Sequence, residues 1–269
     1  MSLPLAGFPA GLCKNLEYIF TDVDDTITTD GSLPAGAYSS LWSLRDAGIK
    51  VVPVTGGPAG WCDLMARLWP VAGVIGESGA FYFVYSREEK KMRRVFSHSE
   101  EVLRENDRKK EALLARLCAE VPGAGAASDQ RYRIADLAID IRQDVPPLAP
   151  EAIQKIYDIV KEEGASCATS SIHVNCWFGA YDKISCIKDF LLREAGRPLD
   201  SMQESILYIG DGLNDEPAFR EIRHSVGVAN IRCVLAGLRF PPRYICEKRS
   251  SEGFTEAASY ILQLREARS

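Results

Sequence analysis

Short apolar runs alternate with amphipathic segments at the start of the chain, and this rhythm constrains the fold more than any other feature of the sequence. Residues 16–23, 49–54 and 71–75 have the composition of strands, and residues 38–47 and 61–68 have helical apolar spacing. Nearly continuous apolar strands separated by helices are typical of a parallel sheet with helices on both faces. The sequence therefore predicts an α/β core.

The same rhythm returns near the end of the chain. Residues 205–209, 225–229 and 244–246 are strand-like, and residues 217–222 and 255–264 are helix-like. We therefore expect both ends of the chain to build one core, of residues 1–83 and 180–269.

The middle of the chain has a different pattern. A charged run at 86–94 is typical of a solvated hairpin or linker. A long amphipathic helix is predicted over 100–119, and a second helix begins at Pro150. Residues 132–141 alternate in polarity as a half-exposed antiparallel strand does, and 170–178 form another strand. These features predict an α+β domain of residues 84–179 inserted into the core.

Composition and charge exclude several classes of protein. The 269 residues carry a net charge of −5, which gives no general reason to expect nucleic-acid binding. No apolar run is long enough to span a bilayer, and the N-terminus does not have the pattern of a signal peptide. The eight cysteines form no CxxC pair. We therefore expect reduced thiols and a cytoplasmic location.

Polar side chains follow three of the predicted core strands, at the point where each strand ends. They are Asp22 and Asp24 after the first strand, Thr55 and Gly56 after the second, and Asp211, Asn214 and Asp215 after the strand that resumes the core. Ligands of open α/β sheets bind beyond the carboxyl ends of the strands. We therefore expect these side chains to meet at one edge of the sheet.

Four carboxylates at one edge repel one another. The repulsion is about 4 kcal/mol for a pair about 4 Å apart at an effective dielectric constant of about 20. A divalent cation removes this cost. Because all the candidate ligands are oxygens, the sequence favours Mg²⁺.

The spacing of Asp22 and Asp24 places both side chains on one face of a regular strand, so one can attack while the other handles protons. A carboxylate nucleophile that forms an aspartyl-phosphate is an established route for phosphoryl transfer. Thr55 and the N–H of Gly56, just before a helix, would hold a phosphate. Lys183, where the insert returns to the core, is the expected positive side chain.

Four stretches of the sequence resemble, in order, the four motifs of the haloacid dehalogenase (HAD) superfamily of phosphatases. They are "DVDDT", "VPVTGG", "YDK" and "GDGLND". The insert resembles the cap of the Cof-like (IIB) subclass, which includes sucrose-phosphate and mannosyl-3-phosphoglycerate phosphatases. The resemblance covers residues 16–82 and 181–264, and it implies a HAD-like Rossmannoid core with an inserted α+β cap.

The resemblance also implies a role for each motif residue. Asp22 would be the nucleophile and a Mg²⁺ ligand, and Asp24 would be the acid/base that also gives its backbone carbonyl to the metal. The other assignments are Asp211 and Asp215 as metal ligands, and Thr55, Gly56 and Lys183, with Asn214 nearby, as phosphate-binding residues. From the cap, Ser171, His173 and Asn175 are candidates for contacts with the substrate.

The function implied is a Mg²⁺-dependent phosphatase that hydrolyses a small phosphorylated metabolite, such as a sugar phosphate, through an aspartyl-phosphate. A phosphotransferase or mutase would need the same aspartates, and a non-catalytic module that binds Mg²⁺ and phosphate is a third reading. The expected partner is a small phosphate ester, without nucleic acid or membrane, and the sequence leaves the oligomeric state open. Gly57 and Ser78 depart from the subclass pattern and bear on specificity, and Glu77 is either a site residue or an ordinary polar edge.

Overall fold

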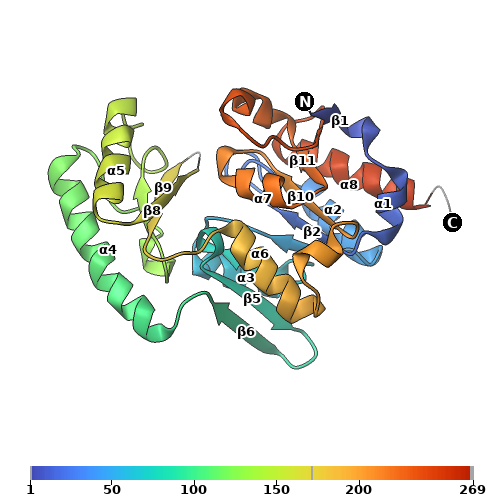
Figure 1. Ribbon diagram of the computed structural model, residues 1–269, viewed down its shortest axis with the longest axis horizontal. Helices are drawn as coiled ribbons and strands as arrows, with labels where there is room; N and C mark the ends of the chain where they lie inside the picture. Colours follow the sequence, from blue (N-terminus) through green and yellow to red (C-terminus); the bar gives the residue numbers. More distant parts are fainter. Residues whose placement is uncertain (1, 171, 267–269) are drawn as a thin grey trace.

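A six-stranded parallel sheet forms the centre of the computed structural model, which describes residues 2–170 and 172–266 (Figure 1). Five of the predicted core strands lie in this sheet, and a short N-terminal strand is added at one edge, but the strand predicted over 71–75 belongs to a separate antiparallel sheet. In spatial order the strands are β1 (Leu3–Pro4), β12 (Tyr244–Ile245), β11 (Ser225–Gly227), β10 (Ile206–Gly210), β2 (Tyr18–Thr21) and β3 (Lys50–Pro53). The predicted α/β core with a parallel sheet is confirmed.

Helices cover both faces of this sheet because the side chains of each strand alternate between the faces. Ile19 of β2 packs in the apolar cluster that contains α1 (Ala10–Asn15), α2 (Ala35–Asp46) and α8 (Ser250–Glu266). Its neighbours Tyr18 and Phe20 point the other way, into the cluster of α6 (Lys183–Phe190) and α7 (Glu216–Glu221). Both faces are buried, which explains the nearly continuous apolar character of the strands.

The edge position of β3 explains the proline in its sequence. Within the six-stranded sheet β3 pairs only with β2, so Pro53, which lacks an N–H, removes no hydrogen bond from a central ladder. Beyond it, Val54 forms a single bridge with Ile75. That bridge joins the sheet to a three-stranded antiparallel sheet of β4 (Val74–Gly76), β5 (Phe81–Ser86) and β6 (Lys91–Phe96), on which α3 (Ala59–Leu68) packs. The charged run lies in the hairpin of β5 and β6, as predicted.

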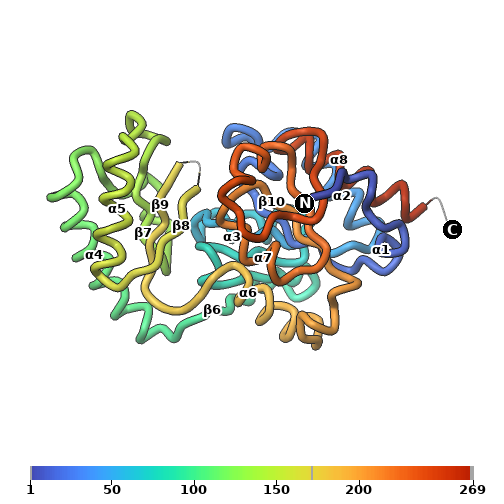
Figure 2. The backbone as a smooth tube through the Cα atoms, turned by 45° about the horizontal axis from the view of Figure 1, so that its top comes forward, coloured from blue at the N-terminus to red at the C-terminus, as the bar shows by residue number. Residues whose placement is uncertain are grey.

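The cap has its own hydrophobic cluster and lies beside the core (Figure 2). Two helices, α4 (Glu100–Glu120) and α5 (Pro150–Glu162), cover one face of an antiparallel sheet. Its strand order is β7 (Leu137–Asp140), β9 (His173–Trp177) and β8 (Ser166–Thr169). The division into residues 84–179 and the rest stays a prediction, and β5 crosses the expected boundary.

One prediction about the cap is wrong. The alternation over 132–141 predicted a half-exposed strand, but all four residues of β7 are buried. The free edge of β7 is covered as well: the Ala138 carbonyl accepts from the N–H of Ala127, and the Ala138 N–H donates to Gln130 Oε1. The carboxylate of Asp140 accepts hydrogen bonds from the loop that follows it. Polarity within a strand therefore did not indicate exposure here.

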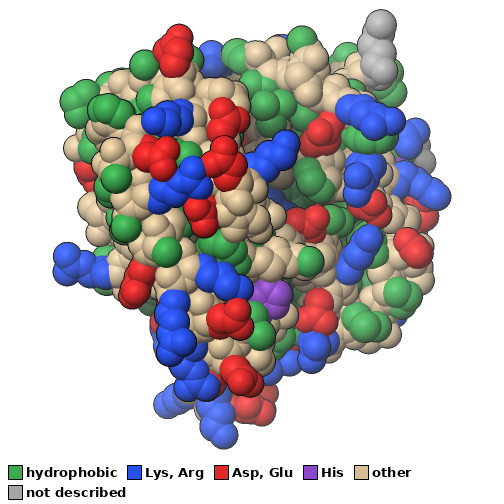
Figure 3. Space-filling view, turned by 60° about the vertical axis from the view of Figure 1, so that its left-hand side comes forward, with side chains coloured by type: hydrophobic (Ala, Val, Ile, Leu, Met, Phe, Trp, Pro, Cys, Tyr) green, Lys and Arg blue, Asp and Glu red, His purple; other side chains and the backbone are tan. Residues whose placement is uncertain are grey.

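The helices and the surface bear on the predicted absence of membrane and nucleic-acid partners. None of the described helices has both the length and the apolar character that crossing a bilayer requires. On the face drawn in Figure 3, Lys and Arg side chains are interspersed with Asp and Glu.

Candidate active site

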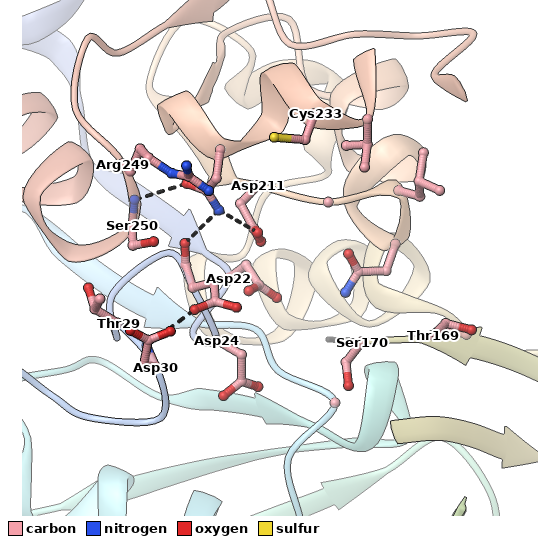
Figure 4. A pocket seen from close by; sticks show the side chains of 18 of the residues that line it. Asp22, Asp24, Thr29, Asp30, Thr169, Ser170, Asp211, Cys233, Arg249 and Ser250 are labelled. Carbon is pink, nitrogen blue, oxygen red and sulfur yellow. Dashed lines mark hydrogen bonds between the residues drawn. The ribbon is translucent and has the colours of Figure 1, made fainter. Parts of the chain in front are cut away.

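Three neighbouring strands bring the predicted site residues to one edge of the sheet. Asp22 follows β2, Thr55 follows β3, and Asp211 follows β10, and these strands are adjacent in the order β10, β2, β3. One carboxylate oxygen each of Asp22, Asp211 and Asp215 lies within 4.8 Å of the other two. Figure 4 shows Asp22, Asp24 and Asp211 around a common space. The three clustered carboxylates form a candidate site for a divalent cation.

Lys183 is the positive side chain of this cluster. It is the first residue of α6, and its Nζ donates to Asp22 Oδ1 at 2.5 Å and to Asp215 Oδ1 at 2.7 Å. The helix start is fixed by Asp182, whose side chain accepts from the N–H of Ser185. Burial lowers the pKa of Lys183, but the two carboxylates more than offset this, so its pKa lies above the ordinary value. The lysine is therefore charged and held between two aspartates.

Asp215 is completely buried and organises the loop after β10. Its Oδ1 also accepts from the Tyr208 hydroxyl at 2.6 Å, and its Oδ2 accepts from the N–H groups of Asp211 (3.0 Å) and Gly212 (3.1 Å). A Cβ atom at Gly210 would lie 2.4 Å from Asp215 Oδ2, so only glycine fits there. Asp215 thus holds the loop that carries Asp211.

Asp211 is held by two polar neighbours. Asn230 Nδ2 donates to Asp211 Oδ2 at 2.8 Å, and Thr26 Oγ1 donates to Asp211 Oδ1 at 3.3 Å. Asn230 also donates to the backbone carbonyl of Asp25, so it ties the loop after β2 to the loop after β10. The sequence did not indicate this role for Asn230, because the residues that it joins are about 200 positions apart in the chain.

The pKa values of three of these carboxyl groups are raised, in each case mainly by burial. Burial raises the pKa of Asp22 well above its usual range; Lys183 opposes this, and Asp215, Asp211 and Asp24 add to it. Burial, and then Asp215, raise the pKa of Asp211 to about 7. Burial also raises the pKa of Asp24. The site therefore holds more negative charge than Lys183 neutralises, and its hard oxygen donors fit a divalent cation.

Asp24 lies at the same edge but outside the group of three carboxylates. Its Oδ2 accepts from Thr55 Oγ1 at 3.4 Å, and Thr55 Oγ1 accepts from the N–H of Gly57 at 2.8 Å. The Thr55 hydroxyl is therefore fixed beside Asp24. The side chain of Asp24 is only partly buried.

A cavity of about 1050 Å³ opens over these residues. Its core wall includes Asp22, Asp24, Gly56, Asp211, Asn214 and Arg249, and its cap wall includes Arg142, Tyr157, Thr169, Ser170 and Asn175. Figure 4 shows Thr169 and Ser170 on the opposite side of the space from the aspartates. A molecule bound to the carboxylate cluster would thus also face the cap.

No family model matches the sequence. Solved structures match most of the chain: a protein of Thermoplasma acidophilum has a TM-score of 0.70 at 17% identity, over 92% of this chain and 98% of that one. The sucrose-phosphatase of Synechocystis sp., solved with sucrose and phosphate, has a TM-score of 0.63 at 14% identity, over 92% and 98%. A HAD subclass IIB sugar phosphatase has a TM-score of 0.61 at 15% identity, over 91% and 98%.

The chain has the haloacid dehalogenase fold. Its structural neighbours include phosphatases of that superfamily, and the HAD-like architecture expected from the four sequence motifs is confirmed. In this HAD fold the four motifs converge on the edge that carries Asp22, Thr55, Lys183 and Asp211.

The two cap candidates that the structure describes, Asn175 and His173, differ in their relation to the cavity. Asn175 lines the cavity, and its Nδ2 donates to the Gly56 carbonyl at 3.1 Å and to Asp136 Oδ2 at 2.7 Å. His173 is buried in β9 and does not line the cavity, and burial lowers its pKa. Ser171 lies outside the described residues.

A buried arginine of the cap joins Asn175 at this contact. Arg133 Nη1 donates to the Gly56 carbonyl at 2.9 Å, and the guanidinium also pairs with Asp129 and Asp136. Two cap donors therefore hold the loop that follows β3. The sequence did not indicate Arg133, because nothing in its local pattern distinguishes a buried ion pair from a surface one.

Glu77 is a core residue whose side chain binds the backbone of the cap. Its completely buried carboxylate accepts from the N–H of Ala59 at the start of α3 and from the N–H groups of Ile134, Ala135 and Asp136 in the cap. The side chain does not line the cavity. Neither reading left open by the sequence fits this geometry: Glu77 does not reach the cavity, and it is a buried contact between core and cap instead of an ordinary polar edge.

Proposed function

We propose that this protein is a Mg²⁺-dependent phosphatase that hydrolyses a small phosphorylated metabolite of the sugar phosphate class. The observation that supports this most is the cluster of Asp22, Asp211 and Asp215 around Lys183, at the base of a cavity shared by core and cap. Pockets for small ligands have volumes of about 300 to 1,000 Å³, so a sugar phosphate fits the scale of this one.

The residues that would hold Mg²⁺ are Asp22, Asp211 and Asp215, with the backbone carbonyl of Asp24. Carboxylate and carbonyl oxygens are the ligands that this ion prefers. When bound, the ion supplies positive charge that offsets the carboxylates and the oxygens of a phosphoryl group.

The chain's own residues would carry the reaction in two steps. In the first, a carboxylate oxygen of Asp22 attacks phosphorus, the ester P–O bond breaks, and Asp24 gives its proton to the leaving alcohol oxygen. In the second, Asp24 takes a proton from water, the water oxygen attacks phosphorus, and the aspartyl-phosphate bond breaks to release inorganic phosphate. The raised pKa of Asp24, caused by burial, favours the protonated form that the first step needs.

The remaining site residues would position the phosphoryl group. Gly56 and Asn214 line the cavity. The Thr55 hydroxyl and the Lys183 ammonium group contact its lining residues Asp24 and Asp22, so they would supply further donors. Phosphoryl transfer depends on such positioning and charge stabilisation more than on covalent chemistry. The cap would exclude water and contact the leaving group.

The proposed substrate class is supported by the structural neighbours and by the cavity. The names of two of them, sucrose-phosphatase and sugar phosphatase, describe enzymes that act on phosphorylated sugars. We infer the same class for this chain because its cavity has polar walls from both core and cap.

Phosphate release from p-nitrophenyl phosphate tests the proposal. Wild-type protein should turn over with Mg²⁺ and stop with excess EDTA, and Asp22→Asn should reduce the rate to background while its circular dichroism spectrum stays native. A near wild-type rate in Asp22→Asn would contradict the aspartyl-phosphate route. Transfer of the phosphoryl group to an added sugar in place of water would assign a phosphotransferase instead.

A further inference from the structure

More negative than positive side chains line the cavity. Six carboxylates line it, from Asp22, Asp24, Asp25, Asp30, Asp211 and Glu252. Among the described lining residues, Arg142 and Arg249 are the only Lys or Arg side chains. Lys183 lies deeper and is already paired with two aspartates. The two arginines are therefore the cations that a substrate meets on the cavity wall.

Arg249 belongs to the core wall. The next residue, Ser250, donates its N–H to Asn230 Oδ1 at 2.9 Å, and Asn230 in turn donates to Asp211 (Figure 4). The backbone at Arg249 is thus tied to the carboxylate cluster. Its guanidinium makes no hydrogen bond or ion pair with any residue that the structure describes.

Arg142 belongs to the cap wall and is held in the same manner. It follows β7 in a loop fixed by the buried Asp140, whose carboxylate accepts from the N–H groups of Arg142 (2.9 Å), Gln143 (2.7 Å) and Asp144 (2.9 Å). Within the described part of the chain its guanidinium also has no hydrogen-bond or ion-pair partner. Both arginines therefore have fixed backbones and free, charged side chains.

We propose that Arg142 and Arg249 bind a second anionic group, a carboxylate or a second phosphate, on the leaving part of the substrate. This inference rests on the proposed phosphatase function. Guanidinium groups bind carboxylate and phosphate with paired hydrogen bonds, and they stay charged at all physiological pH values. Six carboxylates would repel a second anion from this cavity unless cations on the wall offset them.

The alternative is that the arginines only attract the phosphoryl group that is transferred. In that case they would favour every phosphate ester alike. A second anionic subsite instead discriminates between esters that differ in one charged group, so substrate pairs separate the two explanations.

The test compares phosphate release from matched pairs of substrates. The carboxylate arm uses 3-phosphoglycerate against glycerol 1-phosphate, and the phosphate arm uses glucose 1,6-bisphosphate against glucose 6-phosphate. In the wild type, kcat/KM should be higher for the more anionic member of at least one pair, by about tenfold or more. In Arg142→Gln and in Arg249→Gln that ratio should fall by about tenfold. Arg104→Gln, on the exposed surface of α4, is the matched control and should keep the wild-type ratio.

Equal kcat/KM values within both pairs, or an equal loss for both members in the arginine variants, would overturn the inference and leave the phosphatase function standing. Binding of the same pairs to Asp22→Asn, measured by calorimetry, separates the two proposals further. If the wild type hydrolyses none of these esters, but Asp22→Asn binds the more anionic member better and loses this preference when Arg142→Gln is added, the function is wrong and the subsite stands. Equal binding of both members overturns the subsite alone.

Discussion

Replacement of Asp211 by asparagine should stabilise the protein when no metal is bound. An amide has nearly the shape of the carboxylate. Its oxygen would still accept from Asn230, and its NH₂ group would donate to the Thr26 hydroxyl, so both present contacts keep a partner. The variant therefore removes a negative charge from the cluster without leaving a buried polar group unsatisfied.

The size of the effect follows from the pKa of Asp211. Burial and Asp215 raise this pKa from the ordinary value of 3.8 to about 7. At about 1.4 kcal/mol per pKa unit, ionisation of this group costs the folded protein up to about 4 kcal/mol. We expect a gain of about 2 to 4 kcal/mol in the free energy of unfolding at pH 8, because the residue is partly exposed. For a chain of this size that raises Tm by roughly 4 to 16 °C.

The sign of the pH dependence follows from linkage. Because the folded-state pKa of Asp211 lies above the unfolded value, its stabilising contribution is complete below about pH 4 and is lost as pH rises through about 7. Metal-free wild-type protein should therefore lose stability between pH 5 and pH 8. The Asp211→Asn variant should show a smaller loss, so the difference between the two proteins should be largest at pH 8.

Thermal unfolding followed by circular dichroism in EDTA, at pH 5, 6, 7 and 8, measures both quantities. In the wild type, Mg²⁺ at 10 to 100 times its Kd should restore about 1 to 3 kcal/mol at pH 8 and little at pH 5. Asp211→Asn should respond weakly to Mg²⁺. A lower Tm for the variant than for the wild type at pH 8 in EDTA would refute the reasoning, because it would show that the carboxylate stabilises the metal-free fold.

Three further substitutions probe the site and its supports. Asp24→Asn should lower kcat by about 10²- to 10⁴-fold, the usual contribution of a general acid or base, and should accumulate phosphorylated protein in rapid-quench experiments; unchanged steady-state kinetics would count against its proton role. Gly210→Ala would place a Cβ atom 2.4 Å from Asp215 Oδ2, so we expect a loss of about 1 to 3 kcal/mol in urea unfolding, and wild-type stability would contradict the close approach. Arg133→Met removes the cation paired with the buried Asp136 carboxylate and the half-buried Asp129 carboxylate and should cost about 3 to 5 kcal/mol, whereas Arg131→Met, at an exposed neighbour, should cost less than about 0.5 kcal/mol.

The local pattern of the chain was enough to predict the core. Apolar runs and helical spacing are properties of consecutive residues, and they indicated each strand of the parallel sheet except β1, which has two residues and is exposed. Parallel strands end at a common edge, so polar residues after strand ends could also be assigned to one place. This is why Asp22, Thr55 and Asp211 could be grouped from the sequence.

Contacts between distant parts of the chain could not be predicted in this way. Asn230 joins two loops, Glu77 and Arg133 join core and cap, and β7 is buried on both faces despite its alternating pattern. The residues next to a Glu or Arg in the sequence do not show whether its side chain faces solvent or is buried against polar groups of a distant segment.

The sequence by itself determined the order of strands and helices along the chain and the acidic residues at the strand ends, because periodicity and residue type are local. Only the tertiary structure decided that Lys183 lies between Asp22 and Asp215, and that Arg142 and Arg249 share one cavity. The first arrangement depends on how α6 packs against the sheet, and the second on how the cap lies against the core. The physical reason is that burial and electrostatic coupling arise from neighbours in space, whereas the sequence specifies only neighbours along the chain.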